Sequence, residues 1–146
     1  MLKYGFVLYV LLLNSILGAQ NHENIKGLWK GRLTQYEGGY QELYDFEIYF
    51  NKTDSVIAGY TYLKAKQASG VIRFVGCYRG DTLHLVEKEV VFSQKPEGLS
   101  WCFKKLQLTI NTIGTRQILK GHWQADSQYG SCIPGEVSVE KVKPRA

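Results

Sequence analysis

The side chains best suited to proton transfer are few and widely spaced in this 146-residue chain. The histidines are His22, His84 and His122. No Asp or Glu lies at a fixed sequence distance from His84 and His122 that would mark a catalytic pair. A general base needs a partner within hydrogen-bond reach, and the spacing supplies none. The histidines therefore predict no catalytic centre, and the sequence assigns no catalytic residue.

Carboxylates occur in two pairs whose spacing could support acid–base chemistry. Asp45 and Glu47 are two residues apart, and so are Glu87 and Glu89. Residues two apart on a strand share a face, and alternating acids are typical of the solvated face of a sheet. No Gly-x-Ser-x-Gly motif and no glycine-rich phosphate loop accompanies them. An enzyme is therefore the least favoured class of function.

The three cysteines, Cys77, Cys102 and Cys132, do not have the spacing of metal ligands. A structural zinc site usually combines cysteines a few residues apart with further Cys or His ligands, and these cysteines have neither. The sequence therefore predicts no metal site and no cofactor. Three cysteines in an exported protein instead suggest one disulfide with one cysteine left over.

Aromatic residues are the remaining candidates for binding, since the chain has ten tyrosines and three tryptophans. Several buried tyrosine hydroxyls converging in a cavity would suit an amphipathic ligand with few polar atoms. The alternative is that tyrosine simply favours strands. The residues that we expect to line such a cavity are Trp29, Tyr44, Tyr60, Tyr62, Tyr78 and Trp123.

The segments that must position these residues read as β-strands throughout. Apolar and aromatic residues alternate with polar ones at a period of two, and turn residues interrupt the alternation regularly. In one run, Phe46 and Ile48 share a face while Asp45 and Glu47 share the other. The eight predicted strands cover residues 26–36, 40–51, 55–65, 70–78, 82–93, 101–113, 115–125 and 135–143.

Short connections make consecutive strands antiparallel, so the predicted chain runs up and down. An open sheet would expose two edges, and closure into a barrel removes them. We therefore predict an all-β fold, a single eight-stranded antiparallel up-and-down barrel, with a two-sheet sandwich as the alternative. The apolar alternation changes between Leu85 and Val90, which predicts a β-bulge in the fifth strand.

The predicted strand directions select the disulfide. Cys102 begins the sixth strand and Cys132 precedes the eighth, which places both at one end of the barrel. Cys77 ends the fourth strand at the other end, roughly 33 Å away along a ten-residue strand. Because bridged Cα atoms lie within about 7 Å, we predict a Cys102–Cys132 bond. Cys77 is then free, most simply as a small buried apolar residue.

The first residues are interpreted as a targeting segment and not as part of the fold. Lys3 precedes an apolar run over 6–13, and the small residues Gly18 and Ala19 follow it. This order is that of a secretory signal peptide cut after Ala19. We expect 1–19 to be removed and 20–146 to form one domain, secreted or periplasmic, with no stable membrane span after cleavage.

The charge of the chain argues against one large class of partner. The net charge is +5, and the basic residues are scattered, with Lys104–Lys105 the one adjacent basic pair after the predicted signal peptide. A nucleic-acid-binding protein needs a clustered basic face. We therefore expect no nucleic-acid partner.

Gly27, Leu28 and Trp29 open the first predicted strand with a Gly-x-Trp motif. This motif at the start of an eight-stranded meander resembles the calycin group, which comprises lipocalins, fatty-acid-binding proteins and avidins. The resemblance implies that the tryptophan closes the barrel floor with a basic side chain from the chain end packed on its ring. Candidates for that side chain are Lys141, Lys143 and Arg145.

Two further motifs flank the late strands. Trp101–Cys102 precedes the sixth predicted strand, and a Cys-x-Pro-Gly motif from Cys132 to Gly135 precedes the last one. Together they resemble a set of small secreted barrels without an assigned activity. This resemblance supports the predicted disulfide and implies nothing about function.

Two classes of function fit this barrel. The first is a carrier of a small amphipathic ligand, since eight strands enclose just enough space for one small molecule. The second is a secreted interaction or inhibitor module, which presents loops at the disulfide end to another secreted protein. Aromatic and large apolar residues would anchor such a contact. The expected anchors are Tyr36, Tyr40, Leu99 and Tyr129.

Overall fold

The computed structural model describes residue 22 and residues 24–144, so the predicted signal peptide at 1–19 lies outside the described residues. The regular structure within these residues consists of strands, without a helix. The strands are β1 (Gly27–Thr34), β2 (Leu43–Thr53), β3 (Ile57–Lys64), β4 (Ser69–Arg79), β5 (Thr82–Gln94), β6 (Phe103–Ile113), β7 (Arg116–Ser127), β8 (Gly130–Ser131) and β9 (Gly135–Lys141).

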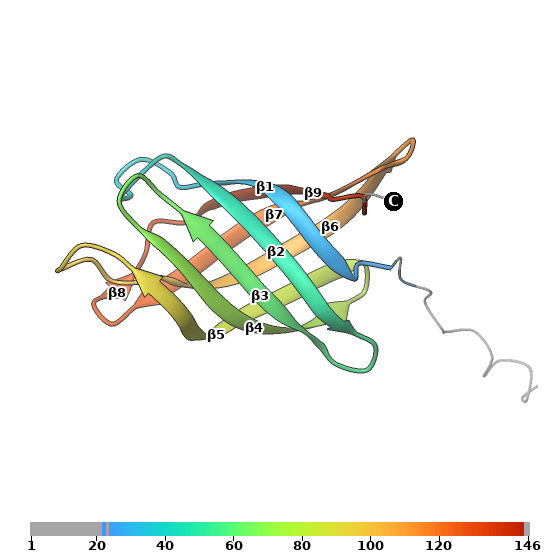
Figure 1. Cartoon of the computed structure of the whole chain (residues 1–146), viewed down its shortest axis with the longest axis horizontal. Coiled ribbons are helices and arrows are strands. Elements are labelled where there is room, and N and C mark those ends of the chain that lie inside the picture. Colours follow the sequence, from blue (N-terminus) through green and yellow to red (C-terminus); the bar gives the residue numbers. More distant parts are fainter. Residues whose placement is uncertain (1–21, 23, 145–146) are drawn as a thin grey trace, which may run out of the picture.

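Eight of these strands close into an antiparallel barrel (Figure 1). Consecutive strands pair from β1 to β7, and β9 lies between β7 and β1 and closes the ring. The predicted barrel is thereby confirmed, and the sandwich is excluded. The short strand β8 is an addition that the sequence did not predict, and it pairs with the end of β7 outside the ring.

The two ends of the barrel differ in their connections. Short turns join β2 to β3, β4 to β5 and β6 to β7 at the end where the C-terminus lies (Figure 1). The longer connections, 35–42, 95–102 and 128–134, gather at the opposite end together with the short one at 65–68. We call that opposite end the disulfide end, because the loops there carry Cys102 and Cys132.

The disulfide Cys102–Cys132 forms as predicted, with its Cα atoms 6.2 Å apart. The expectation that Cys77 is buried is wrong, because its side chain is exposed. Cys77 lies at the end of the barrel opposite the disulfide, where the inward positions of β4 belong to Gly76 and Tyr78, so the residue between them faces outward. The sixth strand also begins two residues later than expected, at Phe103.

Irregularities in β5 confirm the predicted bulge. The register with β4 shifts between Val71 and Ile72 and again between Arg73 and Phe74, so that Lys88 and Val91 of β5 have no partner. The bulge at Lys88, between the two acids, places them on opposite faces. Glu87 lies opposite the inward Phe74 and is buried, whereas Glu89 lies opposite Arg73 and pairs with it on the outer face. The expectation that Glu87 and Glu89 share a solvated face is therefore wrong.

Just before these bulges, β5 parts from β6. The two strands pair only from Leu83 to Val86, although β5 continues beside β4 to Gln94. The loop 95–102 crosses the resulting gap and places the Trp101 ring against the inner side of β4. A Cβ atom on Gly70 would lie 2.7 Å from that ring, so only glycine admits this contact. At the disulfide end the barrel wall is consequently completed by this loop and not by β5–β6 pairing.

The opposite half of the barrel is filled by its own side chains. The largest fully buried residues at that end and in the middle of the barrel are aromatic, namely Trp29, Phe46, Phe50 and Phe74. Trp29 donates its indole N–H to the carbonyl of Ile25 at 2.8 Å. The Lys141 ammonium lies 5.9 Å from the centre of the Trp29 ring and donates to the carbonyl of Asn24 at 2.7 Å. This is the contact that the Gly-x-Trp resemblance implied.

The loop closed by the disulfide spans 30 residues. Replacing both Cys102 and Cys132 by serine is expected to lower the free energy of unfolding by about 3–4 kcal/mol, because the unfolded chain regains loop entropy. Urea unfolding followed by circular dichroism measures this change. Cys77→Ser serves as the control and is expected to change the free energy little, since Cys77 is exposed and unbridged. Equal effects of the two changes would contradict this assignment.

Candidate functional site

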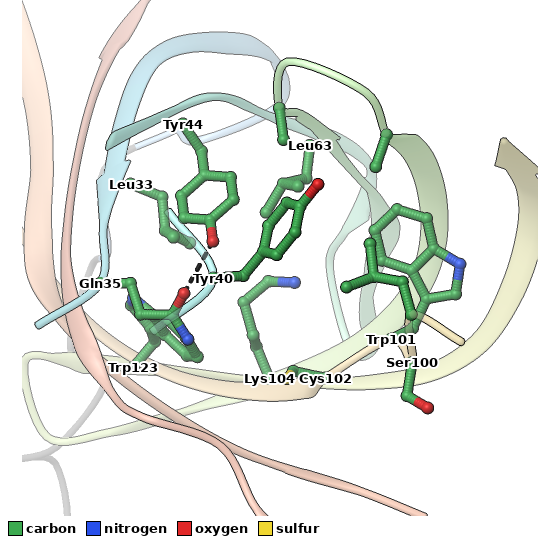
Figure 2. A pocket seen from close by; sticks show the side chains of 13 residues that line it. Leu33, Gln35, Tyr40, Tyr44, Leu63, Ser100, Trp101, Cys102, Lys104 and Trp123 are labelled. Carbon is green, nitrogen blue, oxygen red and sulfur yellow. Dashed lines mark hydrogen bonds between the residues drawn. The ribbon is translucent and has the colours of Figure 1, made fainter. Parts of the chain in front are cut away.

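A cavity of about 80 Å³ opens at the disulfide end of the barrel. Its walls come from strands on opposite sides of the ring and from the loops at this end, as Figure 2 shows. Most of the wall is apolar, and the lining side chains include Leu33, Leu63, Ala65, Ala68, Leu99, Trp101 and Trp123. Five further residues with polar side-chain groups, Gln35, Tyr40, Tyr44, Ser100 and Lys104, complete the lining together with Cys102.

A chain of hydrogen bonds holds one wall in place. The Tyr44 hydroxyl donates to Gln35 Oε1 at 2.7 Å (Figure 2), and the Gln35 amide N–H₂ donates to the carbonyl of Ile133 at 2.9 Å. Burial raises the pKa of the Tyr44 phenol above its ordinary value, so at neutral pH the hydroxyl keeps the proton that it donates. These two hydrogen bonds thus connect β1 and β2 to the loop beside Cys132.

A charged pair lies at the base of the cavity, inside the barrel. The side chains of Lys104 and Glu87 are 3% and 0% exposed, and Lys104 Nζ lies 2.9 Å from Glu87 Oε1. The main-chain N–H of Lys104 also donates to Glu87 Oε1, at 2.8 Å. The hydroxyl of Thr61 donates to the second carboxylate oxygen, Oε2. We call these three residues the interior triad.

The interior triad stands where the barrel wall divides. The β5–β6 ladder ends at the pair Val86–Lys105, and Lys104 is the next residue along β6. There the Glu87 carboxylate accepts from the Lys104 main-chain N–H. Burying two charges costs several kcal/mol each, and only close pairing with further hydrogen bonds offsets that cost. The triad supplies both, so the gap between β5 and β6 forms without an unsatisfied buried side-chain polar atom among the described residues.

Of the six predicted cavity residues, the structure brings two together at this site. Tyr44 and Trp123 line the cavity, and the Trp123 indole donates to the carbonyl of Thr34 at 2.8 Å. Trp29 is inside the barrel but in the filled half. Tyr78 lies at that same end, half-buried and stacked on His22 with ring centres 3.6 Å apart.

The expectation that Tyr60 and Tyr62 line the interior is wrong. Thr61, between them, lies opposite the inward Ile48 and is buried, so its two neighbours face outward. Tyr60 pairs with Tyr49, which is 46% exposed. Tyr60 and Tyr62 alternate in this strand with Gly59 and Thr61, so the larger aromatic side chains suggest the wrong inward face.

The four predicted loop anchors divide between the cavity and the rim. Tyr40 and Leu99 line the cavity, and Figure 2 shows the Tyr40 ring lying across it. Tyr36 and Tyr129 are 49% and 78% exposed, and neither lines the cavity. Burial and the nearby Glu136 raise the pKa of Tyr36. The anchoring role of these residues stays a prediction.

The interior triad was not predicted from the sequence, although a signal for it exists. Lys104 has the same strand parity as Leu106 and Leu108, which places it on the inner face of β6. Glu87 has the parity of Leu83 and Leu85 before the bulge. A lysine and a glutamate in phase with buried leucines predict a buried pair.

The described residues contain no group of three or more His, Cys, Asp or Glu side chains placed to hold a metal ion. They also contain no helix that is long and apolar enough to cross a membrane.

Breaking the interior triad is expected to destabilise the fold strongly. Lys104→Met leaves a buried carboxylate without its counter-ion, and Glu87→Gln leaves a buried ammonium, so each is expected to cost about 3–5 kcal/mol. The Lys104→Met/Glu87→Gln double variant is expected to cost less than the sum of the two, because it buries no charge. Urea unfolding of all four proteins measures the coupling.

Lys105→Met is the matched control, since Lys105 is exposed on the outer face of the same strand. It is expected to change the free energy of unfolding by no more than about 0.5 kcal/mol. Additive effects of Lys104→Met and Glu87→Gln would show that the two side chains do not act as a pair.

Comparisons with protein-family models, with curated proteins and with solved structures found no match to this chain.

Proposed function

We propose that this protein is an exported barrel that binds a small amphipathic molecule in the cavity at its disulfide end. The observation that carries the proposal is the unequal filling of the barrel, because one half is packed solid while the other holds an apolar cavity with a few polar groups. Concave, mostly apolar sites with few well-placed polar groups are typical of small-molecule binding.

The size of the cavity limits what enters it. Sites for drug-sized ligands measure about 300–1,000 Å³, and an engineered cavity of about 150 Å³ holds benzene. A cavity of about 80 Å³ accepts only one end of a ligand. The remainder of the molecule passes Tyr40 and Leu99 at the mouth and reaches solvent.

Two features support export. A disulfide is typical of oxidising compartments such as the extracellular space and the periplasm, and the predicted signal peptide at 1–19 agrees with that location. The barrel and the Lys141–Trp29 contact also support kinship with the calycin group, whose architecture suits a ligand carrier.

A second candidate function is that of a secreted interaction module. The observation that favours it is Tyr129, which is 78% exposed at the β7–β8 turn, close in sequence to the disulfide. An exposed aromatic side chain on a rigid frame is a typical interface anchor. The expected partner is then another secreted protein.

Native mass spectrometry of protein purified from its own host tests the first proposal. The wild type is expected to carry an additional non-covalent mass. Ala68→Phe is expected to reduce that occupancy roughly tenfold, because Ala68 is buried and lines the cavity. Ala58→Phe, on the outer face of β3, is the control and is expected to retain the ligand. Retention by Ala68→Phe equal to that of the wild type would contradict the proposal.

Pull-down from the extracytoplasmic fraction of the host tests the second candidate. If Tyr129 is an anchor, Tyr129→Ala is expected to weaken capture of a specific partner by roughly 2 kcal/mol or more. Tyr49→Ala, which removes an exposed tyrosine from the barrel side, is the control. Unchanged capture by Tyr129→Ala would exclude this role.

A further inference from the structure

We propose that the buried end of the ligand is an uncharged hydrogen-bond acceptor, such as the carbonyl oxygen of a ketone, ester or amide, which accepts from the Lys104 ammonium. This inference rests on the proposed binding function of the cavity and specifies the chemistry of its ligand.

Most of the side-chain donors around the cavity are already used within the protein. The Tyr44 hydroxyl donates to Gln35, whose own amide N–H₂ donates to a main-chain carbonyl. The Trp123 indole donates to another main-chain carbonyl, and the Trp101 indole donates to the hydroxyl of Ser93 at 2.7 Å. A ligand that binds among these groups finds their donors occupied, apart from the second N–H of the Gln35 amide.

Lys104 is different, because its ammonium carries three N–H donors. Among the described residues, the recorded acceptor for Nζ is Glu87 Oε1 at 2.9 Å. Figure 2 shows the Lys104 ammonium reaching into the space between Tyr44, Tyr40 and Trp101. It is therefore the one charged donor that the described lining residues offer to an acceptor atom entering the cavity, on a side chain that is 3% exposed. The hydroxyls of Tyr40 and Ser100 and the second amide N–H of Gln35 are uncharged donors, whose hydrogen bonds are weaker.

The neighbouring carboxylate decides the charge of that acceptor. Glu87 already balances the charge of Lys104, and Thr61 and the Lys104 main-chain N–H hold the carboxylate in place. An anionic ligand would bring a second carboxylate close to Glu87 and lose its own hydration. A cationic ligand would meet the ammonium. An uncharged acceptor gains a charge-assisted hydrogen bond without burying another charge.

The apolar wall agrees with this choice. Leu33, Leu63, Ala65 and Ala68 surround the space and offer contact only to hydrocarbon. A molecule with an acceptor oxygen near one end of a short alkyl chain matches both the wall and Lys104.

Three probes of similar size and different charge test the inference: hexan-2-one, hexanoate and hexylammonium. Each is titrated at neutral pH into the ¹⁵N-labelled wild-type protein, and amide shifts of the cavity residues report binding. Hexan-2-one is expected to bind roughly tenfold or more tightly than either charged probe, the factor that one hydrogen bond to a charged donor supplies. Carbonyl-labelled hexan-2-one is expected to show a downfield ¹³C shift on binding.

The Lys104→Met/Glu87→Gln variant is expected to weaken hexan-2-one binding roughly tenfold. Lys105→Met is the control and is expected to leave the affinity unchanged. If the double variant does not fold, the carbonyl ¹³C shift with wild-type protein still decides whether the oxygen accepts a hydrogen bond in the cavity.

The outcomes separate this inference from the proposed function. Binding of hexanoate or hexylammonium as tightly as hexan-2-one, or a bound ketone without the ¹³C shift, overturns the inference and leaves the cavity a binding site. If no probe shifts the cavity amides and host-purified protein carries no small molecule, the inference and the proposed function both fail.

Discussion

The carboxylate of Glu87 accepts hydrogen bonds from both the main-chain N–H and the ammonium of Lys104, at the point where β5 leaves β6. A closed barrel normally satisfies its backbone by continuous ladders between neighbouring strands. Here the β5–β6 ladder stops after four pairs. Beyond its end, the Glu87 carboxylate accepts from the main-chain N–H of Lys104. The path of the loop 95–102 and the cavity beside it depend on this replacement of a main-chain acceptor by the Glu87 carboxylate.

Two different kinds of packing therefore share one barrel. In the filled half, Trp29 and three phenylalanines occupy the interior, which eight strands make just wide enough for side chains. In the half near the disulfide, β5 bends away, and loops take over part of the wall. The Cys102–Cys132 bond links two of those loops, so the covalent constraint lies beside the part of the barrel with the fewest strand pairs. A filled floor with a cavity at the mouth is the arrangement on which the proposed ligand binding rests.

The barrel and the disulfide could be predicted from the sequence, because both follow from the alternation of apolar and polar residues and from the spacing of the turns. The bulge in β5 could also be predicted from the sequence, because the alternation breaks there. The sequence did not show which acid lies inside, since the position of the bulge decides whether Glu87 is in phase with Leu85. For Tyr60 and Tyr62 the pattern was regular, but only the pairing of Thr61 with Ile48 identifies the inward face. The cavity could not be predicted either, because alternation shows which side chains face inward but not how completely they fill the interior.

The central claim is that Glu87 protects the Lys104 main-chain N–H beyond the end of the β5–β6 ladder. Amide hydrogen exchange at Lys104, measured by nuclear magnetic resonance on the wild-type protein, tests it most directly. We expect the Lys104 amide to be protected about as strongly as that of Leu106, which lies within the ladder. Exchange at Lys104 as fast as in the exposed turn at Gly114 would contradict it.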